Sequence, residues 1–377
     1  MTALSLYVHV PFCASRCGYC DFNTYTAKEL GSGVDQENFH EFLIREIKIA
    51  SEHLGDRPVD SVFIGGGTPT LIGASALNSV LESIGNSFNL APNIEITTEA
   101  NPDSVDALML EQLRAGGFTR ISLGMQSAAS NVLKVLQRTH TPGASVSAAK
   151  LARAAGFDHV NLDLIYGTPG ESDQDVRDSV SAVIDAGVDH VSAYSLIVEQ
   201  GTPLARQVAR GELPAPDDDI CADRYEIIDT MLGAAGFDWY EVSNWARPGG
   251  ECTHNQAYWL NSDWWGIGPG AHGHVGGTRW WNHKHPSTYA AALESGSSLR
   301  AGEETLTPEQ AHTEMIMLGL RTRAGLTADC LTESESERVP GLIGRGILDS
   351  SAWDAGVVRV TPRGRLLADL AVRELLG

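Results

Sequence analysis

The sequence predicts an α/β protein, in which a partial (β/α)6 barrel of the TIM type precedes a smaller C-terminal α/β domain that ends in a winged-helix-like unit. Three observations favour this fold. Short apolar, β-branched runs alternate with helical patterns, and these runs lead into glycine-rich or polar segments. A chain of 377 residues with 42% hydrophobic content can also bury one large core and a smaller one.

Six runs are the best candidates for the barrel strands. They are residues 4–10, 59–65, 94–100, 120–126, 159–165 and 190–196. Apolar residues recur at helical spacing near residues 36–54, and segments 73–85 and 146–156 repeat this pattern. Because strands and helices alternate, we expect parallel strands joined by right-handed crossovers, with any chemistry at the C-terminal ends of the strands.

Each predicted strand leads into residues that suit a site. The cysteine-rich loop follows the first strand, GGGTP the second, TEANP the third and GMQS the fourth. The fifth carries Asp163 before IYGTP, and the sixth reaches Ile197 and Glu199. Taken singly these are weak signals, since glycines after strands often form tight turns and polar residues there are often surface or capping residues. Together they indicate one functional face.

We expect three regions along the chain. Residues 1–230 form the partial barrel, residues 231–300 form a connecting segment, and residues 301–377 form a C-terminal helical domain. In the last region, residues 307–323 are typical of a helix. A further helix, a short strand and a final helix follow, which is the order of a winged-helix unit.

The charge balance argues against nucleic acid as a partner. The formal net charge is −21, from 48 acidic and 27 basic residues, whereas phosphate backbones reward clustered lysine and arginine. A winged helix raises DNA binding as an alternative, but residues 301–377 hold 12 acidic against 8 basic residues, so a docking or lid role over the barrel mouth is preferred. No signal peptide or membrane span is evident, and we expect a cytoplasmic protein.

Cys13, Cys17 and Cys20 form a CxxxCxxC motif on one predicted loop. In a reducing compartment, clustered cysteines indicate metal ligands or redox groups rather than disulfides. A structural zinc would need a fourth ligand, for which His9 is the nearby candidate. Iron–sulfur cubes normally take four cysteines, so three would leave one iron open. The other three cysteines are expected to pack as small apolar residues: Cys221, Cys252 and Cys330.

The motif, with Tyr19 just before its last cysteine, resembles the hallmark of radical S-adenosylmethionine (SAM) proteins. The resemblance implies a 4Fe–4S cluster on Cys13, Cys17 and Cys20, whose open iron is chelated by the amino and carboxylate groups of SAM. It also implies that an electron from the reduced cluster can cleave SAM to methionine and a 5′-deoxyadenosyl radical. An electron donor for the cluster is then an expected partner.

Nearly the whole chain resembles one branch of that family, the oxygen-independent coproporphyrinogen III dehydrogenases (oxidases) and the HemW haem chaperones. By this resemblance Tyr7 lies near the methyl end of SAM, Gly66 near its methionine portion, and Glu99 hydrogen-bonds to it. Residues that hold a second SAM in the dehydrogenases match further positions: Tyr19, Gly67, Thr68, Gln126, Arg138, Asp163 and Ile197. The missing side chains of the glycines would also let backbone groups approach a ligand.

Two departures favour the chaperones. The dehydrogenases continue their motif to CxxxCxxCxC, where this chain has Phe22, and they carry a long extension before the residue matching Tyr7, where this chain has six residues. The resemblance therefore predicts a protein that binds haem and transfers it to apo-haemoproteins such as respiratory enzymes. The alternative is a dehydrogenase, in which the adenosyl radical takes hydrogen from propionate side chains and vinyl groups form with loss of carbon dioxide.

The segment HNQAYW matches the HNxxYW motif of the HemW group. An imidazole can ligate haem iron, and an amide, a phenol and an indole suit a flat macrocycle. The candidate haem-binding residues are His254, Asn255, Tyr258 and Trp259. Without the resemblance, the same residues would be core aromatics beside a buried, hydrogen-bonded histidine. Further candidate iron ligands are Cys252, His272 and His274.

The glycine-rich segment 264–275, WWGIGPGAHGHV, resembles a loop of the same family. As a dinucleotide-binding fingerprint it fails, because no helical pattern and no acidic partner follow at the expected distance. We expect its glycines to let the loop pass close to the cluster or to a tetrapyrrole.

Overall fold

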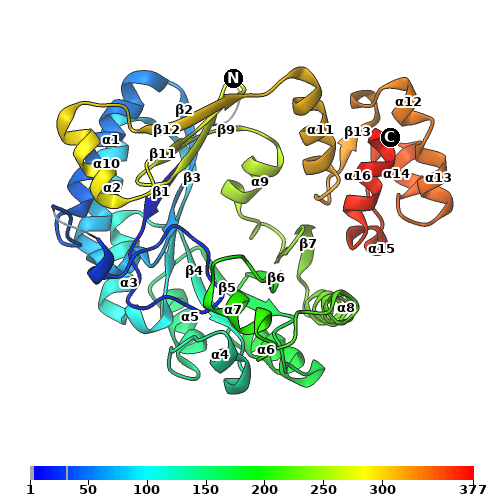
Figure 1. Cartoon of the computed structure of the whole chain (residues 1–377), viewed down its shortest axis with the longest axis horizontal. Coiled ribbons are helices and arrows are strands. Elements are labelled where there is room, and N and C mark those ends of the chain that lie inside the picture. Colours follow the sequence, from blue (N-terminus) through cyan, green and yellow to red (C-terminus); the bar gives the residue numbers. More distant parts are fainter. Residues whose placement is uncertain (1–3, 31–32) are drawn as a thin grey trace.

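Six parallel strands form the centre of the computed structural model, which describes residues 4–30 and 33–377 (Figure 1). The strands are β1 (Leu4–Val10), β2 (Pro58–Gly66), β3 (Asn89–Ala100), β4 (Arg120–Gln126), β5 (His159–Tyr166) and β6 (His190–Ser195). They pair in chain order, and every pair is parallel. The predicted strands and the α/β class are therefore confirmed, although β3 begins at Asn89 rather than at residue 94.

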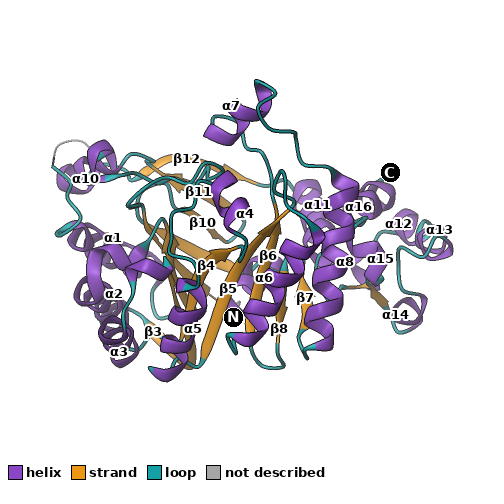
Figure 2. Cartoon of the chain, turned by 90° about the horizontal axis from the view of Figure 1, so that it is seen from below, coloured by secondary structure: helices purple, strands orange, loops and turns teal. Residues whose placement is uncertain are grey.

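The helices between these strands cover the outer side of the sheet (Figures 1 and 2). They are α1 (Phe39–Leu54), α2 (Gly73–Ser87), α3 (Ala107–Gly116), α5 (Ala144–Ala154) and α6 (Asp173–Asp185), whereas the short α4 (Ser130–Val135) lies at the end of the sheet. In α1 the residues at helical spacing are buried, among them Leu43, Ile47 and Ala50. This helix begins at Phe39 and not at residue 36, because the Asp35 carboxylate accepts the backbone N–H of Asn38 (2.9 Å) in a turn before it.

The following residues extend the sheet on both sides to twelve strands. The added strands are β7 (Asp238–Glu241), β8 (Asn244–Ala246), β9 (Asp263–Ile267), β10 (His272–Val275), β11 (Thr278–Asn282) and β12 (Arg300–Thr305). Strand β9 is parallel to β1, whereas β10 to β12 and β7 to β8 are joined by antiparallel pairing. The complete order is β12-β11-β10-β9-β1-β2-β3-β4-β5-β6-β8-β7.

Four helices connect these added strands: α7 (Pro203–Ala209), α8 (Asp218–Ala234), α9 (Thr253–Trp259) and α10 (Pro286–Ser295). In Figure 1, α9 lies on the opposite side of the sheet from α1 and α2, and it contacts β2. Figure 2 shows α4 and α7 beyond the C-terminal ends of β4 and β6. The inner side and this end of the sheet therefore receive segments that are distant in sequence.

The two faces of the six parallel strands differ in character. On β1, Leu4, Leu6 and Val8 are fully buried on the outer face, towards the helices. The inner face carries buried polar residues, which follow the same period of two on every strand. They include Ser5, His9, Ser61, Glu95, Thr97, Arg120, Ser122, Asn161, His190 and Ser192. Because buried polar groups need partners, this inner face must form a hydrogen-bonded network.

Residues 308–377 form a helical unit beside the sheet (Figure 1). Its elements are α11 (Pro308–Gly319), β13 (Leu326–Thr327), α12 (Glu333–Ser336), α13 (Val339–Gly344), α14 (Ser350–Asp354), β14 (Val357–Val358), α15 (Pro362–Arg365) and α16 (Ala368–Leu376). Strands β13 and β14 pair in antiparallel fashion, and α11 contacts α16. The expected helix, short strand and final helix are thus present.

Within the described residues, none of the helices combines the length and the apolar character that crossing a membrane requires.

Candidate functional site

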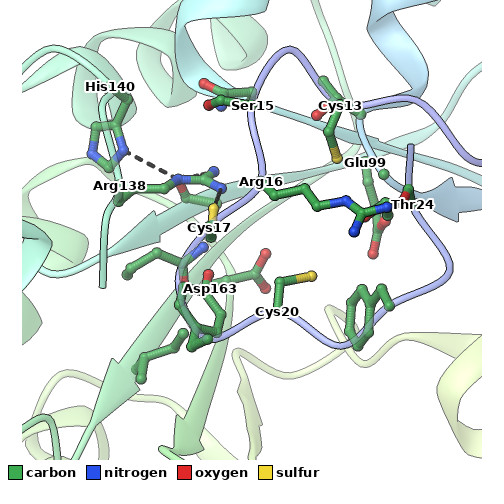
Figure 3. A pocket seen from close by; sticks show the side chains of 18 of the residues that line it. Cys13, Ser15, Arg16, Cys17, Cys20, Thr24, Glu99, Arg138, His140 and Asp163 are labelled. Atoms are coloured by element: carbon green, nitrogen blue, oxygen red, sulfur yellow. Dashed lines mark hydrogen bonds between the residues drawn. The ribbon is translucent and has the colours of Figure 1, made fainter. Parts of the chain in front are cut away.

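A cavity of about 740 Å³ lies at the C-terminal ends of the parallel strands (Figure 3). The structure brings almost all predicted cluster and SAM residues to its wall. These are Cys13, Cys17, Tyr19, Cys20, Gly66, Gly67, Thr68, Glu99, Gln126, Arg138, Asp163 and Ile197. Tyr7 is the exception: it lies deeper on β1, where its hydroxyl is 3.0 Å from Nδ1 of His9. The predicted gathering of polar residues at one end of the sheet is therefore present.

The cysteine loop, residues 13–25, is held by backbone hydrogen bonds from distant segments. The N–H of Cys13 donates to the Tyr25 carbonyl (3.0 Å), which closes the loop on itself. In its middle, the N–H of Gly18 donates to Leu136 O (3.1 Å), and the N–H of Leu204 donates to Gly18 O (2.8 Å). Because these bonds use main-chain atoms, the cysteine side chains stay free to face the cavity.

In Figure 3 the three thiols lie around one space, with Arg138 beside Cys17. Arg138 Nη1 donates to Cys17 Sγ at 3.3 Å. Burial raises the pKa of Cys13, and it raises that of Cys20 to about 11. Since iron and zinc bind the thiolate, metal binding here must release protons. In residues 4–30 and 33–377, no three His, Cys, Asp or Glu side chains are grouped to hold one metal ion.

Partly buried carboxyl groups also line the cavity. Burial raises the pKa of Glu99 to about 7, although its carboxylate accepts the N–H of Gly66 at 2.9 Å. Burial also raises the pKa of Asp163, which accepts from Asn161 Nδ2 (2.7 Å) and Ser122 Oγ (3.2 Å). The charged residues on the cavity wall are five acids and two arginines: Asp21, Glu99, Asp103, Asp163, Glu199, Arg16 and Arg138. This excess of carboxylates favours a cationic ligand.

The GGGTP glycines have a packing role that differs from the expected one. A Cβ at Gly67 would collide with the backbone of Phe12, next to Cys13, and a Cβ at Gly66 would collide with the His9 ring. Gly66 also has a φ of 117°, which side-chain-bearing residues rarely adopt. The absent side chains therefore let β2 lie directly against the start of the cysteine loop, in addition to lining the cavity.

We expect Gly67→Ala to impair cluster assembly. The added methyl group must push the Phe12 backbone and Cys13 away, at a cost of about 1–3 kcal/mol typical of overpacking. The measurement is iron and sulfide content after anaerobic reconstitution. As a control, Gly85→Ala lies inside α2, where the added Cβ would meet only Leu90 Cδ1 at an ordinary contact distance of 4.0 Å, and should raise stability by about 0.5–1 kcal/mol. Wild-type iron content in Gly67→Ala would contradict this account.

Several cavity residues were missed by sequence reasoning. They are Thr24, Asn101, Asp103, Ser122, Gln137, His140 and Tyr194. The third strand end gave a signal for Asn101 and Asp103, but Gln137 lies in a loop without any pattern.

Gln126 and Gln137 have φ of 68° and 52°, a left-handed backbone that is uncommon outside glycine. Such strain often marks functional sites, yet it becomes visible only in the fold.

The HNQAYW motif forms α9, and its histidine lies inside the protein rather than at the cavity. His254 is 1% exposed, and burial lowers its pKa to about 4, so the ring is neutral at physiological pH. Its Nδ1 lies 2.9 Å from Ser61 Oγ, and its Nε2 lies 3.1 Å from the Tyr258 hydroxyl. Ligation of haem iron by His254 would therefore require one of these hydrogen bonds to be replaced.

A buried ion pair holds α9 against the sheet. Glu95 accepts the backbone N–H groups of Thr253 (3.1 Å) and His254 (3.0 Å), and Arg120 Nε lies 3.0 Å from its carboxylate. Although burial alone would raise the pKa of Glu95, Arg120 and these donors hold it below its ordinary value. Cys252 is buried, as expected, and its thiol donates to Glu95. Residues of β3 and β4 therefore hold the HNQAYW motif in place.

The glycine-rich segment packs on the base of the cysteine loop. A Cβ at Gly268 would collide with the His9 carbonyl, and a Cβ at Gly270 would collide with the Asn23 side chain. Asn23 Nδ2 in turn donates to the carbonyls of Pro269 (3.0 Å) and Lys284 (2.9 Å). The glycines therefore permit a close approach between these two loops.

Comparison with known proteins agrees with this architecture. Residues 7–183 match the model of the radical SAM superfamily. The fold is similar to the solved structure of coproporphyrinogen III oxidase (HemN) from Escherichia coli, with a TM-score of 0.84 and 22% identity, covering 99% of this chain and 90% of that one.

Two curated relatives match along nearly their full length. The heme chaperone HemW of Mycobacterium tuberculosis is 54% identical over 372 residues, which cover 99% of this chain and 94% of that protein. The heme chaperone HemW of Bacillus subtilis is 33% identical, and 99% of each chain is covered. The predicted resemblance is confirmed, and the chain belongs to the HemW family of radical SAM proteins.

Proposed function

We propose that this protein is a haem chaperone, which binds haem and transfers it to apo-haemoproteins such as respiratory enzymes. The observation that carries the proposal is the 54% identity to a protein named heme chaperone HemW, over 99% of this chain. A local feature supports it. Phe22, at the position of the further cysteine in the dehydrogenases, is 64% exposed at the cavity wall.

The cysteine loop and the cavity suit a 4Fe–4S cluster with SAM. The donor set is three thiols on one anchored loop, and they would hold the cluster: Cys13, Cys17 and Cys20. Gly66 and Glu99 would bind SAM, and Tyr7 would support this wall from below. When bound, the cluster and SAM supply one-electron chemistry. The chain itself supplies partly buried carboxylates for a cationic ligand. We also propose an electron donor as a partner that reduces the cluster.

Phe22, rather than the charge of the cavity wall, argues against the alternative function, because Glu99, Arg138 and Asp163 match positions that, by the resemblance, the dehydrogenases also use. The second-SAM positions, Tyr19, Gln126 and Ile197 among them, line the same cavity, and we propose them as contacts for any additional ligand there.

SAM affinity is expected to fall as the pH drops below 7. Glu99 has a pKa of about 7, so its carboxyl becomes neutral below this pH and loses the charge-assisted hydrogen bond that it would accept from the SAM amino group. The loss should reach about tenfold per pH unit. Glu99→Gln should bind SAM weakly at every pH between about 6 and 8, and its affinity should not show this fall with pH. Isothermal titration calorimetry on the cluster-loaded wild type and on cluster-loaded Glu99→Gln measures the SAM affinity at each pH.

Glu46→Gln is the matched control for that experiment. Glu46 is another buried glutamate whose pKa burial raises to about 7, but it lies outside the cavity and is bound by Gly268, Asn282 and Tyr289. Its variant should keep the wild-type pH dependence. An unchanged pH slope in Glu99→Gln would show that another group binds the SAM amino group.

The proposed function is tested by two anaerobic assays on the cluster-loaded protein. The first is a haem titration followed by visible absorbance, with transfer to an apo-cytochrome as a second stage. The second incubates the protein with coproporphyrinogen III, SAM and a reductant. We expect haem binding and transfer without protoporphyrinogen. Vinyl-bearing product would instead establish the dehydrogenase, and absence of haem binding would refute the chaperone.

A further inference from the structure

A second histidine-bearing surface lies on the inner side of the sheet, beyond α9. Strands β10 and β11 place His272 opposite Trp281, and their rings are stacked with centroids 5.9 Å apart and planes inclined by 30°. On the same face, Trp264 contacts both His274 and Tyr258 of α9. We define the His272 surface as His272, Trp281 and the neighbouring Lys284.

The His272 imidazole is available for a ligand. Its side chain is exposed, and neither ring nitrogen has a hydrogen-bond partner in the described part of the chain. Partial burial and then the nearby Lys284 lower its pKa, whereas Glu304 on β12 opposes this shift. The ring is therefore neutral at physiological pH, which is the form that ligates metals.

The surroundings of His272 fix the orientation of its ring. Trp281 lies over Gly302 of β12, where a Cβ would collide with the indole. The indole consequently lies against the strand, and the imidazole stacks on it. Lys284 is exposed, and its ammonium has no ion-pair partner among the residues described, so it can meet a carboxylate.

Other histidines are less suitable. His254 has both nitrogens hydrogen-bonded in the interior, and His274 is only 4% exposed. His53 is exposed, but it lies with Trp265 on the opposite side of the sheet, where α1 packs. The His272 surface, by contrast, adjoins the cysteine loop, because the Lys284 carbonyl accepts from Asn23 at 2.9 Å.

From these observations we propose that His272 is an axial ligand of the haem iron, with Trp281 holding the imidazole ring by stacking and Lys284 pairing with a propionate. The inference rests on the proposed haem-chaperone function and assigns the haem to a surface distinct from the cavity. An oriented imidazole can ligate the iron, and a nearby ammonium can pair with a propionate carboxylate.

Haem titrations of the full-length, cluster-loaded protein test this assignment. His272→Ala is expected to weaken haem binding by about tenfold or more and to remove the histidine-ligated absorption spectrum. His272→Cys should bind haem with a thiolate-type spectrum, a change of ligand field that a merely structural role would not produce. Lys284→Gln should weaken binding less than His272→Ala.

His53→Ala is the matched control, since it removes an exposed histidine beside a tryptophan on the other side of the sheet. It should bind haem as the wild type does. If the wild type binds haem and His272→Ala keeps its affinity and spectrum, the inference is wrong while the chaperone function stands. If His254→Gln loses the spectrum and His272→Ala keeps it, the HNQAYW motif holds the iron. A wild type that binds no haem overturns both proposals.

Discussion

Replacing Cys17 with alanine is expected to abolish the iron–sulfur cluster. Cys17 lies between the two other cysteines on the cysteine loop, and its sulfur accepts a hydrogen bond from the partly buried Arg138. Two remaining cysteines cannot hold a cube that already has one iron without a protein ligand. Iron and acid-labile sulfide per chain after anaerobic reconstitution should fall close to zero, and the visible absorbance of the cluster should disappear.

Cys330→Ala is the matched control, because Cys330 is a partly buried cysteine in the C-terminal helical unit, outside the cavity wall. Its iron content should equal that of the wild type. The Cys17→Ala chain also separates the two proposed sites. Since the His272 surface is built on β10 and β11, haem should still bind to it. A Cys17→Ala protein that retains full iron and sulfide would disprove the ligand assignment.

Local patterns were enough to predict the strands and the cysteine site. The inner and outer faces of β1 alternate with a period of two, and the apolar residues of α1 recur at helical spacing, so both elements are specified by nearby residues. The CxxxCxxC spacing lies on one loop, and its chemistry needs no distant partner to be recognised. Parallel strands then place every strand end on the same side.

Contacts between distant segments could not be read from these patterns. The sequence drew attention to the HNQAYW motif for its aromatic and imidazole groups, but not to Ser61, which lies 2.9 Å from His254 across 193 positions of the chain. The sequence also gave no sign that Gly67 lies close to the backbone of Phe12. Such pairings depend on which strands become neighbours and on the direction in which α9 packs, and local periodicity carries neither.

Arg120→Met is expected to lower the free energy of unfolding by about 3–5 kcal/mol, the cost of leaving one partner of a buried ion pair uncompensated. Arg120 is 2% exposed and Glu95 is 8% exposed. Arg120 also donates to the carbonyls of Gly250 (2.8 Å) and Glu251 (2.9 Å), just before α9. Its loss removes donors for both carbonyls and leaves the Glu95 charge in the interior. Urea denaturation followed by tryptophan fluorescence measures the change.

The double variant Arg120→Met with Glu95→Gln distinguishes the charge from the packing. Glutamine removes the unpaired charge and can still accept the N–H of His254, so part of the lost stability should return. Arg210→Met is the control, because the Arg210–Glu212 pair lies on the surface and its loss should leave the denaturation midpoint unchanged. A midpoint in Arg120→Met equal to the wild type would mean that other contacts hold α9. If the prediction holds, Glu95 of β3 and Arg120 of β4 hold the HNQAYW motif in its position. Haem binding at His272 should then weaken only in variants in which α9 separates from the sheet.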